Sequence, residues 1–366
     1  MLATLAAALR GAPDAVAALG AEGVARVVDA AERHGVLPLL AERLASDPRC
    51  PEALRLELQR HARRHAAADL VRELELRRLG HALQEAKVPA LVVKGAHLAY
   101  SLYPRPDLRP RLDTDVLVPA SARPDAVATL ERLGYAPVPV GGGDLISYQA
   151  TFTRARGEGL AHVVDLHWRL ANPQAFGDVL TVEDLDTRAS PIPGMSPWRG
   201  PALADALLIA AVHRIAHHPG DDRLIWLYDL DLIARRLDPA GWRRVVDLAA
   251  GSELGVILNE SLDRTRDLLD TPMPDAVFAD PRLEPGGARA VARAAFLAPD
   301  RPRAHLVAQD FSLLPSWSAR LKWASQYLFP SPRYMRTVYA PASPWPLPLL
   351  YAGRVVRGAW RLIVRS

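Results

Sequence analysis

Two aspartates separated by one residue stand out in this sequence. Asp113 and Asp115 lie directly before the apolar run Val116-Leu117-Val118 in a segment, 114–119, with the composition of a buried strand. Side chains at positions i and i+2 of a strand project from the same face, so the two carboxylates should lie close together. Like charges at that spacing raise each other's pKa unless a cation lies between them. Oxygen donors of this kind suit Mg²⁺ or Mn²⁺, so the pattern predicts a metal site.

A third carboxylate, Asp165, lies inside another apolar segment, 161–170, which we also expect to be a strand. If this strand lies beside 114–119, three carboxylates converge. Two metal ions held there could clamp the attacking and leaving oxygens of a phosphoryl displacement, with one carboxylate free to accept a proton. His167 shares the face of Asp165 and is a candidate ligand-binding residue, although it could instead orient Asp165 or pack beside Trp168.

Cations are found near these carboxylates in the sequence. Gly95 ends an expected strand, 88–95, and opens a helix, where a phosphate can approach the backbone and the positive helix end. Lys94, Arg109 and Arg111 are candidate phosphate-binding residues. A charge such as Lys94 at the end of an apolar strand needs a partner, for which Asp113 is a candidate. The alternative for the two arginines is that they are solvated loop charges.

The segment "LVVKGAHLAYSLYPRPDLRPRLDTDVLV" resembles the polymerase-β-type nucleotidyltransferase superfamily, in which a strand, a glycine turn and a helix precede an Asp-x-Asp strand. More narrowly, it resembles a bacterial family of uncharacterised nucleotidyltransferases. "DLHWRL", "RLIWLYDLDLIA" and "LFPSPRYMRTVY" are also similar to that family, so the resemblance extends from about residue 25 to 360.

The resemblance implies metal-dependent transfer of a nucleoside monophosphate from an NTP, with pyrophosphate release, to an acceptor that the sequence does not identify. Gly95 matches the turn glycine, Asp113 and Asp115 the metal pair, and Asp165 the third carboxylate. The superfamily usually has Gly-Ser or Gly-Gly in the turn, whereas this chain has Gly95-Ala96 and so lacks a hydroxyl ligand for phosphate.

Some members of the superfamily bind or regulate without reacting. The alternative function is therefore a catalytically silent nucleotide-binding or scaffold protein, docked through its basic C-terminus to a membrane or to an assembly that makes surface polymers.

Two other clusters could be taken for metal sites. His213 and His217 are spaced i, i+4 on an expected helix, as in some zinc sites, but Arg214 stands where a metalloprotease has glutamate. Asp229 and Asp231 would point about 200° apart on a helix, so they are not expected to form a metal pair. We expect Asp229 to pair with an arginine across a domain cleft.

The order of elements predicts an α+β fold in which a small mixed-sheet nucleotidyltransferase core is flanked by helical regions. The predicted parts are a helical segment, 1–87; the core, 88–188; a proline-rich connector, 189–202; a helical domain, 203–330; and a basic, proline- and aromatic-rich tail, 331–366. Within the core, strands are also expected at 147–155 and 161–170, joined across 157–159, with a helix over 123–138 stopped at Gly134.

Composition narrows the class of protein. The 366 residues include one cysteine, Cys50, which excludes an intramolecular disulfide and a cysteine zinc cluster and suits a reducing cytoplasm. We expect neither a signal peptide nor a membrane-spanning helix. The net charge is +4, yet the chain carries eight Lys and Arg and no acid after Asp310, so the preceding part is net acidic.

The basic residues of 320–366 alternate with Trp, Tyr and Leu. This pattern predicts peripheral contact with a membrane, a nucleic acid or an acidic partner. The alternative is a solvated basic helix packed on the acidic body of the same chain.

Overall fold

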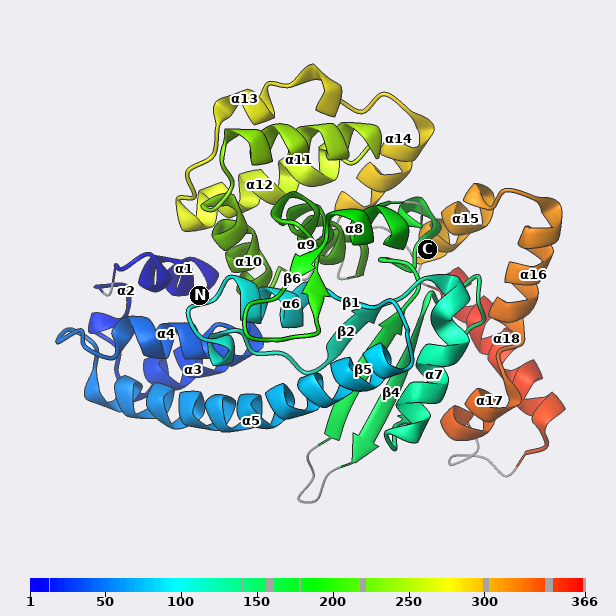
Figure 1. The fold of residues 1–366 in the computed structure, drawn as a ribbon, viewed down its shortest axis with the longest axis horizontal. Coiled ribbons are helices and arrows are strands. Elements are labelled where there is room, and N and C mark those ends of the chain that lie inside the picture. Colours follow the sequence, from blue (N-terminus) through cyan, green and yellow to red (C-terminus); the bar gives the residue numbers. More distant parts are fainter. Residues whose placement is uncertain are drawn as a thin grey trace.

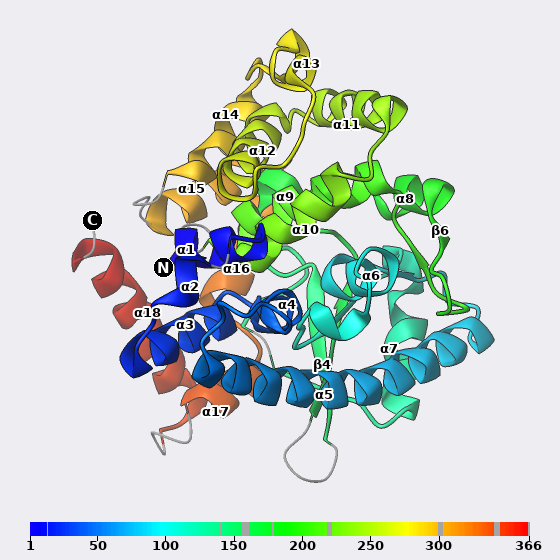
Figure 2. The same ribbon diagram turned by 90° about the vertical axis from the view of Figure 1, so that its left-hand side faces the viewer.

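The fold is described from a computed structural model. The structure describes residues 1–12, 14–139, 141–155, 161–177, 179–217, 222–298, 303–339 and 345–364. For residues 303 and 358–364 it describes the backbone without the side chains. The predicted connection across 157–159 lies outside the described residues. Figure 1 shows the main sheet with helices on both sides of it, and Figure 2 shows the same arrangement from the side of the N-terminal helices. This sheet has five strands.

The main sheet is mixed, as predicted, and has the order β1-β2-β5-β4-β3. Strands β2 and β5 are parallel, whereas β1 pairs with β2, β4 with β5 and β3 with β4 in antiparallel fashion. Its strands are β1 (Leu91–Val92), β2 (Thr114–Leu117), β3 (Ala136–Pro137), β4 (Gln149–Ala155) and β5 (Ala161–His167). A separate two-stranded ribbon joins β6 (Ser190–Pro191) and β7 (Arg199–Gly200).

The N-terminal region is helical, as expected. It contains α1 (Leu2–Leu9), α2 (Asp14–Ala17), α3 (Ala21–Arg33), α4 (Leu37–Leu44) and the 34-residue α5 (Glu52–Glu85). Pro51 directly precedes α5, where a missing N–H costs nothing because the first N–H groups of a helix have no partner inside it.

The first core strand is shorter than the sequence predicts. Only Leu91 and Val92 form a strand. The residues up to Val88 form the turn that closes the C-terminal end of α5, because Val88 N donates a hydrogen bond to Leu83 O at 2.9 Å. Lys94 already begins α6 (Lys94–Ser101) and has a positive φ of 53°. This left-handed conformation is uncommon outside glycine and turns the chain sharply between β1 and α6.

The remaining helices follow the core strands. Within the core are α7 (Arg123–Arg132) and α8 (Val182–Arg188). The C-terminal region contains α9 (Leu203–His217), α10 (Leu224–Ala234), α11 (Pro239–Gly251), α12 (Gly255–Leu269), α13 (Asp275–Phe278), α14 (Ala288–Ala294), α15 (Arg303–Leu313), α16 (Trp317–Leu328), α17 (Pro332–Tyr339) and α18 (Leu347–Val364).

Two apolar clusters hold the sheet between its helices. On one face Val116 and Val164 pack with Leu76, Leu79 and Leu83, the apolar stripe that α5 presents at helical spacing. The larger cluster joins the N-terminal helices with α9, α10 and α12. Apolar packing therefore continues across residues 87 and 203, and the four-part division of the chain stays a prediction.

Gly80 lets the sheet-covering end of α5 approach Trp198 closely. The Trp198 indole Nε1 donates to Leu76 O at 2.7 Å, and a Cβ on Gly80 would lie only 2.6 Å from that nitrogen. A side chain at position 80 would therefore push the buried indole away from α5.

We predict that Gly80→Ala lowers the free energy of unfolding by about 1–3 kcal/mol, because overpacking at Trp198 outweighs the better helix propensity of alanine. Urea unfolding measures this change. The matched control is Gly251→Ala, at a helical position where a Cβ meets no atom within 4 Å, so stability should hold or rise. An unchanged midpoint for Gly80→Ala would contradict the packing argument.

Candidate functional site

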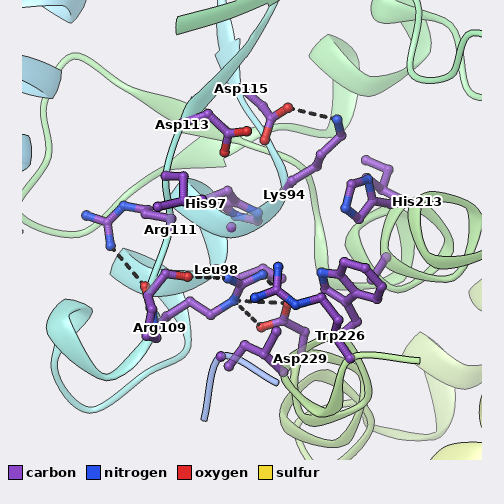
Figure 3. Close-up of a pocket in the computed structure, with 18 of the residues that line it drawn as sticks. Lys94, His97, Leu98, Arg109, Arg111, Asp113, Asp115, His213, Trp226 and Asp229 are labelled. Atoms are coloured by element: carbon purple, nitrogen blue, oxygen red, sulfur yellow. Dashed lines mark hydrogen bonds and ion pairs between the residues drawn. The ribbon is translucent and has the colours of Figure 1, made fainter. Parts of the chain in front are cut away.

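A cavity of about 580 Å³ opens on the face of the sheet opposite Val116 and Val164. Its walls come from three regions of the chain: the N-terminal helices supply His65 and Arg72, the core supplies the carboxylates, and α9 and α10 supply His213 and Trp226. The volume is typical of a small-molecule site. Figure 3 shows Asp113, Asp115 and Lys94 at one end and Arg109 with Asp229 at the other.

The parallel pairing of β2 with β5 brings two of the predicted carboxylates together. Asp115 and Asp165 are direct partners in the register, so both side chains project from the same face. His167 follows on that face, two residues after Asp165. The expected adjacency of the two strands is confirmed, and it rests on a pairing between segments that are 50 residues apart.

Asp165 is held by the neighbouring strand β4. Thr151 Oγ1 donates to its Oδ1 at 2.6 Å, and Gln149 Nε2 donates to its Oδ2 at 3.2 Å. Asn172 Nδ2 in turn donates to Gln149 Oε1 at 3.3 Å. These bonds fix the orientation of the Asp165 carboxylate.

Lys94 pairs with Asp115, and the expectation that its partner would be Asp113 is wrong. Lys94 Nζ lies 2.8 Å from Asp115 Oδ1, and the Nε2 of His167 lies 2.9 Å from the same oxygen. The reason is backbone pairing: Val93 N donates to Asp115 O at 3.1 Å, which sets Lys94 beside Asp115. Burial alone would raise the pKa of Asp115, but Lys94 and His167 hold it well below its usual value.

Asp113 precedes β2 and is half-buried. Burial, and then the like charges of Asp115 and Asp165, raise its pKa to about 6. Repulsion between Asp113 and Asp115 is expected to raise the pKa of one of them. The raised pKa is found at Asp113, because Lys94 neutralises Asp115.

The donors at this end of the cavity fit a divalent cation. One ligand atom each from Asp115, Asp165 and His167 lies within 4.8 Å of the other two. Carboxylate oxygens suit Mg²⁺ and Mn²⁺, whereas imidazole is more typical of transition metals. The sequence predicts Asp113 as the third ligand, but the group of three contains His167 instead. Metal binding by Asp113 stays a prediction.

Arg109 is not a solvated loop charge. Its guanidinium forms a buried, two-pronged ion pair with Asp229 of α10, with Nε–Oδ1 at 2.9 Å and Nη2–Oδ2 at 2.8 Å. Tyr103 also donates to Asp229 Oδ1, at 2.7 Å. Burial alone would lower the pKa of Arg109, but the Asp229 carboxylate raises it. The expected arginine partner of Asp229 across the cleft is thus Arg109.

The glycine of the turn lies against this ion pair. A Cβ on Gly95 would meet Arg109 Nη2 at 3.3 Å, tighter than ordinary van der Waals contact. Gly95 therefore leaves room for the arginine as well as giving access to the helix end. The Arg109 guanidinium is already paired with Asp229, so the binding of phosphate by Arg109 stays a prediction.

Arg111 is also buried and has an acidic partner. It pairs with Asp69 of α5, and its Nη2 donates to Tyr100 Oη at 2.8 Å. The loop between α6 and β2 is thus tied to both helical regions, by Arg111 to α5 and by Arg109 to α10.

Arg72 of α5 is a pocket residue that sequence reasoning missed. It is half-buried in the cavity wall, and among the described residues it makes no hydrogen bond and no ion pair within 4 Å. Burial, and then the nearby Arg111, lower its pKa. No motif marks this residue, because only the packing of α5 across the site places it in the cavity wall.

The rival clusters do not form metal sites among the described residues. The rings of His213 and His217 lie 5.4 Å apart between centroids and are tilted by 35°, and neither residue joins the compact ligand group. Asp231 bonds to Arg235 at 2.8 Å and to Thr271, away from Asp229, so the expected divergence of this pair is confirmed.

A known protein family matches more than half of the chain. The model of a family described as uncharacterised nucleotidyltransferases matches residues 21–270. No curated protein matches the chain. The matched region covers the N-terminal helices from α3, the whole sheet and the helices up to α12.

We predict that Asp229→Asn lowers the free energy of unfolding by about 3–5 kcal/mol, because it leaves the Arg109 charge buried without an anion. The change is measured by urea unfolding. Asp247→Asn, which removes an exposed partner of Arg282, is the control and should change stability by less than about 1 kcal/mol.

A double Arg109→Met/Asp229→Leu variant removes both charges and should recover part of the loss. An Asp229→Asn protein as stable as the parent would refute the structural role of this ion pair.

Proposed function

The chain belongs to the family of uncharacterised nucleotidyltransferases, and from this membership and the site we propose that it transfers a nucleoside monophosphate from an NTP to an acceptor in a metal-dependent reaction. The observation that carries the proposal is the register of β2 and β5, which sets Asp115 beside Asp165 next to the Lys94-Gly95 turn. Carboxylates grouped at a helix N-terminus suit a metal–triphosphate ligand.

Asp115, Asp165 and His167 would hold the ion, with Asp113 completing the group. A bound Mg²⁺ or Mn²⁺ would neutralise the carboxylates and polarise the phosphoryl oxygens. In the transfer an acceptor oxygen forms a bond to the α-phosphorus, the bond to the bridging oxygen of the β-phosphate breaks, and pyrophosphate leaves. Asp165 is the carboxylate proposed to complete the metal site or to accept the acceptor's proton.

Lys94 and Arg72 are the cations best placed to contact phosphate. The Lys94 ammonium now neutralises Asp115 and could move to phosphate oxygens once another cation takes its place. Within the described part of the chain Arg72 has no acidic partner within 4 Å, so its charge is available to a ligand. Arg109 and Arg111 would act mainly by positioning the loop and by their positive field.

The same Lys94–Asp115 contact supports a second candidate. Asp115 is neutralised inside the protein at 2.8 Å, and Gly95-Ala96 offers no hydroxyl to phosphate. Both features suit a nucleotide-binding protein that no longer reacts. In either proposal the protein is cytoplasmic and contacts a membrane or an acidic partner peripherally through residues 320–366.

We predict that the purified protein, with cell extract as the source of acceptor, transfers label from one or more α-labelled NTPs only when Mg²⁺ or Mn²⁺ is present. Asp113→Ala/Asp115→Ala should abolish transfer, because two of the metal carboxylates are gone. Saturable, metal-dependent NTP binding without transfer would select the silent protein. The absence of both transfer and binding would overturn the NTP–metal site.

We predict that Arg72→Gln weakens metal–NTP binding by roughly 10- to 100-fold, the usual size of a lost charge-assisted hydrogen bond. Isothermal titration calorimetry measures the affinity. Arg64→Gln, an exposed arginine on the same helix, is the matched control and should bind like the parent. Equal affinities for the Arg72 and Arg64 variants would show that Arg72 does not contact the bound nucleotide.

A further inference from the structure

The last three helices, α16 to α18, form what we call the C-terminal arm, residues 317–364. Figure 1 shows it along one side of the molecule, beyond the sheet. Of the seventeen large apolar side chains that are exposed among the described residues, the arm carries ten: Trp317, Leu321, Tyr327, Leu328, Phe329, Val338, Trp345, Leu349, Val355 and Val356. Such a concentration on a short part of the chain marks a surface that contacts something other than water.

Helix α16 has apolar side chains on two sides. Its inner side chain Trp323 is buried, stacks on Tyr327 at 5.0 Å and packs against Phe311. Trp317, Leu321 and Leu328 follow the spacing i, i+4, i+11 along one outer line, and Trp317 and Leu321 are 70% and 69% exposed. The inner side accounts for packing on the protein, so the outer line needs a separate explanation.

The arm is also hollowed between the end of α16 and α18. Phe329, Leu347, Pro348, Tyr351, Val355 and Val356 line an open groove of about 630 Å³. The hydroxyl of Tyr351 already has a hydrogen-bond partner, because its Oη donates to Pro330 O at 2.6 Å. The groove therefore offers apolar surface without an orienting polar group, which suits disordered hydrocarbon better than a specific polar ligand.

The charge of the arm has a single sign. Lys322, Arg333 and Arg336 are exposed, and among the described residues no ion pair joins a basic side chain of the arm to an acid. The alternative, a solvated basic helix packed on the acidic body of the same chain, therefore has no ion pair to support it among the described residues. The arm is instead attached by neutral bonds, such as Leu145 N donating to Gln326 Oε1 at 3.1 Å.

We infer that the outer face of the C-terminal arm docks on an anionic lipid bilayer. Exposed Trp and Leu interspersed with Lys and Arg, without acids, are the combination that inserts at the headgroup level and attracts acidic lipids. No described helix is long and apolar enough to cross a membrane, so the arm would lie on the surface.

This inference specifies the peripheral contact named in the proposed function. It does not depend on nucleotidyl transfer, because the residues of the arm line neither the cavity nor the carboxylate group. Failure of the transfer assay therefore leaves it standing, and its own failure leaves the transfer proposal standing.

The test is flotation of the full-length protein with vesicles of phosphatidylcholine alone or with phosphatidylglycerol added. We expect binding to the anionic vesicles that weakens as salt is raised. A triple variant, Lys322→Gln/Arg333→Gln/Arg336→Gln, should bind roughly 100-fold more weakly, at about fivefold per basic residue. Trp317→Ser/Leu321→Ser should also lose binding, because it removes the inserting side chains.

Matched controls lie on α5, away from the arm. Arg63→Gln/Arg64→Gln removes exposed basic residues, and Leu70→Ser/Leu74→Ser removes apolar residues that are 66% and 63% exposed. Both should bind anionic vesicles like the parent. The inference is overturned if anionic vesicles do not bind, if arm and control variants lose binding equally, or if the arm instead forms a dimer that Trp317→Ser/Leu321→Ser dissociates.

Discussion

The parallel pairing of β2 with β5 is the constraint on which the site depends. Asp115 and Asp165 face each other because they are partners in this register, and a shift by one residue would turn one carboxylate to the opposite, apolar face. That opposite face is already filled by Val116 and Val164 against α5, so burial of the apolar side chains fixes the register and, with it, the position of the carboxylates.

Two buried ion pairs extend this constraint to the helical regions. Arg109 joins the loop before β2 to Asp229 of α10, and Arg111 joins the same loop to Asp69 of α5. Each charge lies where water is largely excluded, so each depends on its partner for solvation. The cavity has walls from three parts of the chain, and these two pairs hold the loop between them.

Lys94 links the fold to the proposed chemistry. Its positive φ turns the chain into α6, and its ammonium neutralises Asp115. No described residue lies at hydrogen-bond distance from the Asp113 carboxyl, and its pKa is raised to about 6 by burial and by the other carboxylates. An additional cation at this end of the cavity would relieve that repulsion, which is the physical reason to expect a metal here.

The sequence by itself determined the class of fold, the two carboxylate strands, the divergence of Asp229 and Asp231, and the basic character of the C-terminus. These follow from local patterns: strand and helix periodicity, spacing and charge. Tertiary structure alone decided that Lys94 pairs with Asp115, that His167 joins the ligand group, that Arg109 and Arg111 are bound by acids, and that Arg72 faces the cavity. Those contacts join residues tens of positions apart, and no local pattern encodes which distant side chain packing will bring within reach.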